Sequence, residues 1–317
     1  MPSLSALIAN HPDVEEAGVS ALADTGSALS AVVGAYFVAA GLLPGVLLAE
    51  ATLLTAAVGA GVRVFDGRLR QPGLGAKRPR GFTATDEIPA TAYFAVPCAV
   101  QALLVGLAYE KSSVPSTLVR LGVKAANACG AKRRAAALGR IAAVGAAAFS
   151  EAAIAHPLLA VAGPSQGGLL TRQDLGNTPD LDNAGKVLVR DEQSVTIGVP
   201  WDLETTKASK GAFTPLNIVA VDAHGRFAAL ACRGAARGIE VEELQLIAPH
   251  AAVPVTRGVT RVQPGSPLPA YGELIARLGA NGAPYEIEAN LKAVPGSKRQ
   301  ALRQLSSGRR RVEILSS

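Results

Sequence analysis

The chain has 317 residues, of which 49% are hydrophobic and only 4% aromatic, and its formal net charge is +6. This length is enough to bury a large core in one domain or two. The cysteines, Cys98, Cys129 and Cys232, have no metal-site spacing and are odd in number, which excludes a disulfide-rich scaffold and favours reduced thiols. The abundance of small residues predicts closely packed helices and sheets.

Basic residues gather in four short runs, but no stacking aromatic residues accompany them. The runs are Lys77–Arg80, Lys132–Arg140, Lys298–Arg303 and Arg309–Arg311. We therefore expect solvated surface rather than a nucleic-acid interface.

The four histidines make no ligand spacing and are expected in turns or at the surface. They are His11, His156, His224 and His250. No metal site and no cofactor is expected.

The first long apolar stretch, Leu29–Val62, carries no charge except Glu50 and is long enough to invite a membrane span. Pro44-Gly45 divides it, and no basic flank precedes it. We interpret it as a buried helix followed by a strand, with membrane insertion as the alternative. The N-terminus has no secretory signal pattern, so we expect a cytoplasmic protein.

The middle of the chain predicts mainly helices. A β-like segment at Ala92–Val96 precedes a helix after Pro97. Further helices are expected at Val114–Ala128, at Arg133–Val144, and at Ala147–Val161 with an interruption near His156-Pro157. Thr171 has the character of a helix cap.

The remainder predicts mainly strands. These are Lys186–Arg190, Ser194–Val199, a hairpin of Ile218–Val221 and Phe227–Leu230, Ala251–Thr256 and Pro284–Leu291. A helix is expected at Ala270–Leu278, and the basic end, residues 297–317, is expected to be partly disordered or a docked tail.

Five motifs follow one another in the order and spacing found in γ-glutamyltransferases, and together they carry a resemblance to that family. They are His11-Pro12 to Leu22, Thr25–Val32, Phe65-Asp66-Gly67-Arg68 with Gln71-Pro72, Val96-Pro97, and Ala148-Phe149 to Ile154-Ala155 followed by Gly167–Leu175. The resemblance implies an α/β (α+β) fold of four layers, α-β-β-α, as in N-terminal-nucleophile hydrolases. It also implies a single domain, 1–317, with a large-subunit-like part (1–175), a shortened connection (176–210) and a small-subunit-like part (211–317).

The family's nucleophile heads a strand of pattern T-T-H-x-S-V-V-D-x-x-G-x-A-x-x-L, and Gly211–Leu230 matches its tail. An ungapped match places Pro215 where the nucleophilic threonine belongs, and proline has no hydroxyl group. Thr214 precedes this position, and Thr205 with Thr206 mimics the family's E-T-T. Thr214 and Thr205 are the candidate nucleophiles.

The resemblance also implies a carboxylate anchor at Arg68, because the family's D-G-R-E loop holds a glutamyl carboxylate and a guanidinium suits that task. The alternative is a structural arginine that satisfies backbone carbonyls. The glycine-rich and paired-serine motifs of the family have no counterpart here.

Framework motifs thus persist where reactive ones are missing. We expect a γ-glutamyltransferase-like protein without catalysis, a structural or regulatory subunit with a protein partner or a homo-oligomer. The alternative is a γ-glutamyl-type amide hydrolase or transferase that uses Thr214 or Thr205 and accepts a γ-glutamyl-like small molecule.

Overall fold

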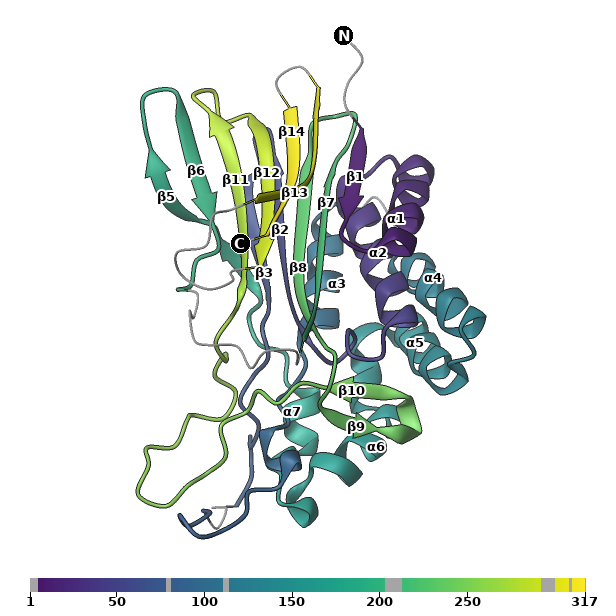
Figure 1. Cartoon of the computed structure of the whole chain (residues 1–317), viewed down its shortest axis with the longest axis vertical. Helices are drawn as coiled ribbons and strands as arrows, with labels where there is room; N and C mark the ends of the chain where they lie inside the picture. The colour runs from purple at the N-terminus through teal and green to yellow at the C-terminus, as the bar shows by residue number, and fades with distance from the viewer. Residues whose placement is uncertain are drawn as a thin grey trace.

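Two six-stranded sheets lie face to face, and helices cover the outer face of one of them (Figure 1). This arrangement comes from a computed structural model, which describes residues 5–77, 81–110, 114–202, 213–291, 300–307 and 310–316. The helices lie on the right of the view and the second sheet on the left.

The first sheet joins strands from both ends of the chain. Its order is β1 (Ala6–Ala9), β7 (Phe213–Val221), β8 (Phe227–Ala235), β2 (Glu50–Ala57), β3 (Gly61–Gly67) and β4 (Asp182–Ala184). All its pairs are antiparallel. The expected hairpin is confirmed as β7 and β8, with Gly225 at φ +75° in the turn, where a residue without Cβ is favoured.

The second sheet is built from the later part of the chain. Its order is β13 (Gln300–Ser307), β14 (Arg310–Ser316), β12 (Pro284–Leu291), β11 (Gly272–Gly279), β6 (Ser194–Gly198) and β5 (Lys186–Arg190). Only β12 and β14 pair in parallel. A small separate ribbon pairs β9 (Ile239–Val241) with β10 (Leu246–Ala248).

The helices pack on the first sheet and on one another. They are α1 (Pro12–Thr25), α2 (Ala28–Leu42), α3 (Ala99–Glu110), α4 (Pro115–Ala128), α5 (Lys132–Val144), α6 (Ala152–Ala162) and α7 (Arg172–Gly176). The buried helix and following strand expected in Leu29–Val62 are confirmed as α2 and β2. Thr171 caps α7 in a capping box with Asp174, as predicted. Among the described helices no single one is long and apolar enough to cross a membrane, although the bent pair Lys132–Ser150 and Ala152–Gln166 passes that test together.

Strand β8 and the part of β7 from Leu216 onward are buried on both faces, which explains their almost unbroken apolar sequence, whereas Pro215 at the head of β7 is exposed. Leu216 and Ile218 face the helices, whereas Val219 and Val221 face the second sheet, because successive side chains alternate along a strand. Strands β11, β12 and β14 supply the other half of the core between the sheets.

Three predicted elements are wrong. The helix expected at Ala270–Leu278 is the strand β11, since alternate residues such as Leu274 and Ala276 enter the core between the sheets. The strand expected at Ala251–Thr256 contains Pro254 and makes only an isolated bridge at Thr256. The β-like Ala92–Val96 begins instead with a 3₁₀ turn after Pro89.

Two further expectations need correction. Helix α6 runs through Pro157, and the break lies earlier, at Glu151, whose backbone is extended. The C-terminal residues expected to be a disordered or docked tail form β13 and β14 where they are described. Val312 and Ile314 explain this result, because both lie fully buried between the sheets.

The expected α/β class with two stacked sheets is confirmed. Within the described residues every helix lies on the side of the first sheet, and none packs on the outer face of the second.

Candidate functional site

Polar side chains gather at one end of the two sheets, on the face of the first sheet that looks toward the second. Glu50 begins β2, Asp66 lies near the end of β3, Arg68 directly follows that strand, and Arg233 lies on β8. Together with Trp201 we call these residues the mouth cluster. Buried charges at the end of a core are costly unless they are paired, so each requires a partner.

Glu50 is the most perturbed member of the mouth cluster. It is only 9% exposed and lies directly opposite Arg233 in the β2–β8 ladder. Burial raises the pKa of the Glu50 carboxyl to about 7, and the opposing effects of Arg233, the Tyr271 backbone N–H and Arg68 only partly offset it. Glu50 can therefore hold or release a proton near neutral pH.

Arg233 is fixed between two aromatic rings. Its guanidinium carbon lies 3.3 Å from the centroid of the Phe213 ring and 3.7 Å from that of Tyr271. Cation–π contacts on both faces hold the charge at the head of β7, where Arg233 pairs with Pro215.

Arg68 is bound by its own loop. Its Nε and Nη2 donate to the two carboxylate oxygens of Asp66, each at 2.9 Å, and its guanidinium lies 4.0 Å from the ring centroid of Trp201. Arg70 also donates to Asp66, at 3.0 Å. Because Asp66 occupies the bidentate edge of Arg68, any substrate would meet the remaining Nη1, and the anchoring role stays a prediction.

The head of β7 is clamped on both sides. Pro215 pairs with Arg233 on β8, and on the other side the Asn10 side chain donates to the Pro215 carbonyl at 2.9 Å and accepts from the Asn217 N–H at 2.9 Å. Phe213, before Thr214, also belongs to the strand. Thr214 is thus an interior position of a hydrogen-bonded strand.

No protein-family model and no curated protein sequence matches the chain. Solved structures do match it. The cephalosporin acylase from Bacillus halodurans, an N-terminal-nucleophile hydrolase, has a TM-score of 0.62 at 12% identity, covering 90% of this chain and 77% of the acylase. The chain has the N-terminal-nucleophile hydrolase fold. Two structures of LmbA agree, with TM-scores of 0.57 and 0.59 at 14% identity over 90% of this chain and 78% of LmbA.

A γ-glutamyltranspeptidase from Pseudomonas nitroreducens is also similar, at 19% identity over 56% of this chain and 65% of its own. Its TM-score of 0.46 is too low to support an argument. The N-terminal-nucleophile hydrolase fold expected from the sequence motifs is therefore confirmed through the acylase and LmbA.

In an N-terminal-nucleophile hydrolase the reacting hydroxyl must stand beside a free α-amine. Side-chain alternation places Thr214 on the helix-covered face with Leu216, whereas Pro215 shares the face of Glu50 and Arg233. Thr205 lies outside the described residues. Of the two candidate threonines, the structure thus locates Thr214 alone, at the same end of the first sheet as Arg68.

The two buried cysteines are not poised to act as nucleophiles. Burial raises the pKa of Cys98 to about 11 and that of Cys232 well above its usual range, so both stay protonated near neutral pH. All three cysteines are free, as expected.

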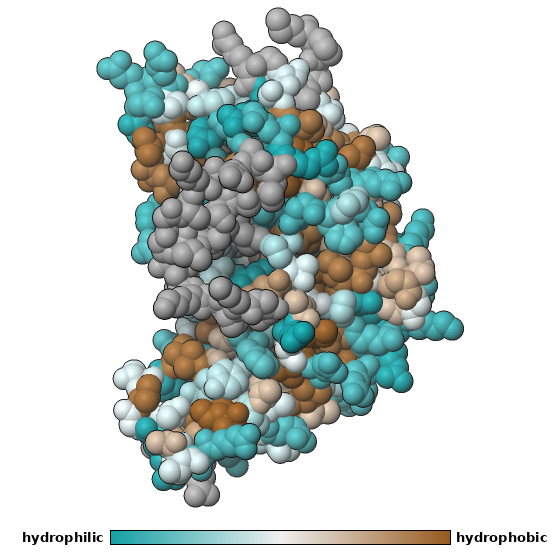
Figure 2. All heavy atoms as spheres, in the orientation of Figure 1, coloured by the Kyte–Doolittle hydropathy of each residue, from teal (hydrophilic) through white to brown (hydrophobic). Residues whose placement is uncertain are grey.

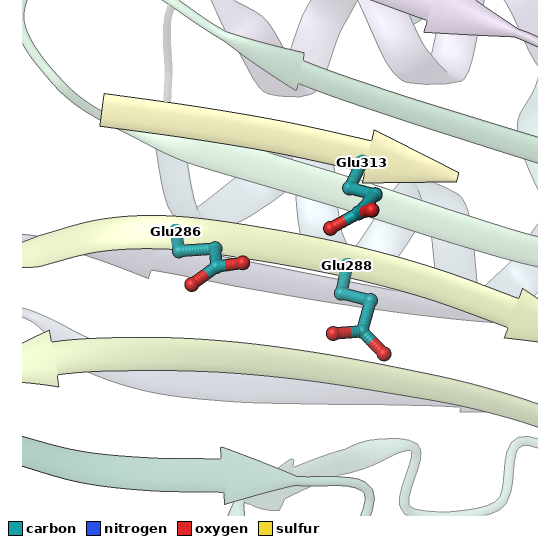
Figure 3. A group of neighbouring side chains, drawn as sticks. All are labelled: Glu286, Glu288 and Glu313. Carbon is teal, nitrogen blue, oxygen red and sulfur yellow. The ribbon is translucent and has the colours of Figure 1, made fainter. Parts of the chain in front are cut away.

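A second group of carboxylates lies away from the mouth cluster, on the outer face of the second sheet (Figure 3). Glu286 and Glu288 on β12 and Glu313 on β14 place ligand oxygens within 4.8 Å of one another. Arg277 pairs with Glu286 at 3.0 Å and with Glu288 at 3.2 Å, and Arg311 pairs with Glu313. Because arginines already neutralise most of this charge, the group is an ion-pair network and not a cation cage.

Sequence reasoning missed Glu50, Arg233 and Trp201 as members of the site. Glu50 did carry a signal, since it is the single charge in the apolar stretch Leu29–Val62. Arg233 and Trp201 carried none, because strand pairing and loop placement alone bring them to the mouth cluster.

Proposed function

We propose that this chain is a non-catalytic member of its fold class that serves as a structural or regulatory subunit of a larger assembly. The observation that carries the proposal is Pro215 at the head of β7, clamped by Asn10 and by β8, where the reaction would need a hydroxyl and a free amine.

The environment of Pro215 suits the binding of an anion. Arg233, stacked between Phe213 and Tyr271, lies beside Pro215 and gives this position a fixed positive charge. A cation at that point could hold a carboxylate. Pro215, hydrogen-bonded within the strand, is compatible with binding or assembly, because neither needs a covalent step.

A partner surface is offered by β5, at the edge of the second sheet. Val187, Leu188 and Val189 are 47%, 42% and 58% exposed on this edge strand, and Figure 2 shows a brown patch at the left edge, where Figure 1 draws β5. Long exposed apolar edges invite strand addition.

We assign this edge to an extended segment of a different protein that carries acidic residues. If two copies of this chain paired antiparallel about Leu188, Lys186 of one would face Arg190 of the other, and like charges directly opposite are unfavourable. An acidic segment would instead meet Arg190 favourably.

The competing function is amide hydrolysis or transfer on a γ-glutamyl-like substrate with Thr214 or Thr205 as nucleophile. Arg68 and Arg233, two cations at one mouth, are the observations that favour it. Hydrolysis of a chromogenic γ-glutamyl anilide distinguishes the two functions. We expect no turnover by the wild type above that of Thr214→Ala and Thr205→Ala. Turnover that either substitution abolishes would establish the enzyme instead.

A further inference from the structure

A pocket lies at the opposite end of the sheets from the mouth cluster. Its volume is about 510 Å³, within the range of small-molecule sites. The turn between β7 and β8 contributes His224 and Gly225, the beginning of β12 contributes Pro284 and Tyr285, and β14 contributes Arg310.

Arg310 lies at the wall of this pocket. Its Nη1 donates a long hydrogen bond of 3.5 Å to the Asp222 carbonyl, and its guanidinium lies against Gly225. A Cβ at Gly225 would stand 2.5 Å from Nη2, so a larger residue there would displace the guanidinium, and the φ of +75° independently favours glycine. The glycine leaves room for the guanidinium beside the turn, and the guanidinium's single long hydrogen bond within the described residues leaves most of its N–H groups for a ligand.

The charge of Arg310 is not neutralised by the nearest acid. Asp222 uses its carboxylate within the turn, where Oδ1 accepts from the N–H groups of His224 at 2.9 Å and Arg226 at 3.0 Å. Among the described residues no carboxylate forms an ion pair with Arg310, and none of those that line the pocket is acidic. A guanidinium in a cavity without a carboxylate is a site for an anion.

We propose that this pocket binds a small organic anion, with its phosphate or carboxylate group on Arg310 and His224 and its apolar body against Pro284 and Tyr285. The volume exceeds what a simple inorganic ion needs, and the ring and the proline provide an apolar wall. The site is separate from the mouth cluster, so it does not depend on whether catalysis survives there.

The test is isothermal titration calorimetry of the full chain with phenyl phosphate, benzoate and inorganic phosphate, each in a separate titration. We expect phenyl phosphate or benzoate to bind at least about tenfold more tightly than inorganic phosphate, because only they reach the apolar wall. The better of these two identifies the acid group. Arg310→Gln should weaken that binding by about tenfold or more.

Two further variants provide a second test of the pocket and a control. His224→Ala changes an exposed turn side chain, so it should fold normally and weaken binding severalfold even if Arg310→Gln does not fold. Arg237→Gln, at an exposed arginine in another turn, should bind as the wild type does. Failure of both organic anions to bind at millimolar concentration, or equal binding by all variants, would overturn the proposal.

Discussion

Glu50 carries the largest electrostatic cost that we can assign to a single side chain in the mouth cluster. Its carboxyl is buried opposite Arg233, yet its pKa rises from 4.5 to about 7. Burial therefore outweighs the attraction of the guanidinium, whose charge is already shared with two aromatic rings.

The raised pKa of Glu50 predicts a pH-dependent stability. Below pH 4.5 Glu50 is protonated in both states, and between pH 4.5 and 7 the unfolded chain loses this proton while the folded protein keeps it. The folded state binds more protons in this window, so its stability falls as pH rises. We therefore compare the free energy of unfolding in urea of Glu50→Gln with that of the wild type. The difference should shift in favour of the variant by roughly 2 to 3 kcal/mol between pH 4.5 and pH 8.

The exposed Glu243 provides the matched control for Glu50. Glu243→Gln should change the free energy of unfolding by no more than about 0.5 kcal/mol at either pH. A constant difference between Glu50→Gln and the wild type across the pH range would show that the Glu50 pKa is not raised.

At the scale of elements, α2 and α4 meet through glycines. A Cβ at Gly122 would lie 2.3 Å from the Phe37 carbonyl oxygen, and a Cβ at Gly41 would lie 2.3 Å from the Gly122 carbonyl oxygen. These contacts fulfil the close packing that the small-residue composition predicted.

Gly122→Ala should therefore lower the free energy of unfolding by about 1 to 3 kcal/mol, because backbone atoms of α2 cannot give way cheaply. Gly139→Ala on α5 is the control, since nothing lies within 4 Å of its added Cβ. It should raise stability by about 0.5 to 1 kcal/mol through helix propensity. Denaturation midpoints measure both, and equal effects would contradict the close contact.

Elements with strong local signals were predictable, and those decided by distant pairing were not. Pro115 and Pro97 mark helix starts, and the turn Asp222–Gly225 marks the central hairpin. Ala270–Leu278 has helix-favouring residues, but β12 and β6 pair along both edges of β11 and the first sheet covers its inner face, and this tertiary context outweighs propensity. Burial also outweighs the local sequence in β14, which begins with two arginines. Its Val312 and Ile314 side chains are fully buried between the sheets.

For the candidate site, the sequence could place Arg68 and the head of β7 through motifs. The sequence could not show that Arg68 donates to the Asp66 carboxylate or that Arg233 lies beside Pro215. Cross-strand neighbours depend on the register of the strands, which the sequence does not reveal.

At the scale of the whole molecule, the exposed β5 edge predicts association with an acidic extended segment. A labelled peptide of alternating valine and glutamate should bind the wild type and lose binding with Val189→Lys, because a buried apolar contact becomes a desolvated charge. Val259→Lys, at a 64% exposed valine elsewhere, is the control and should bind normally.

Sedimentation of the protein alone separates the two kinds of partner. A monomer is expected for the isolated chain. If the protein is a dimer and Val189→Lys dissociates it, the partner of β5 is a second copy of this chain. If Val189→Lys binds the peptide as the wild type does, β5 is not the binding surface.

The most direct test of the central claim, that this scaffold has lost its reacting hydroxyl, is the intact mass of the purified protein after prolonged incubation. Members of the resembled family that are active cleave their own chain before the nucleophile. We predict one species of 32.2 kDa with an unbroken chain through Pro215. Two fragments, the second beginning at Thr205 or Thr214, would contradict the account.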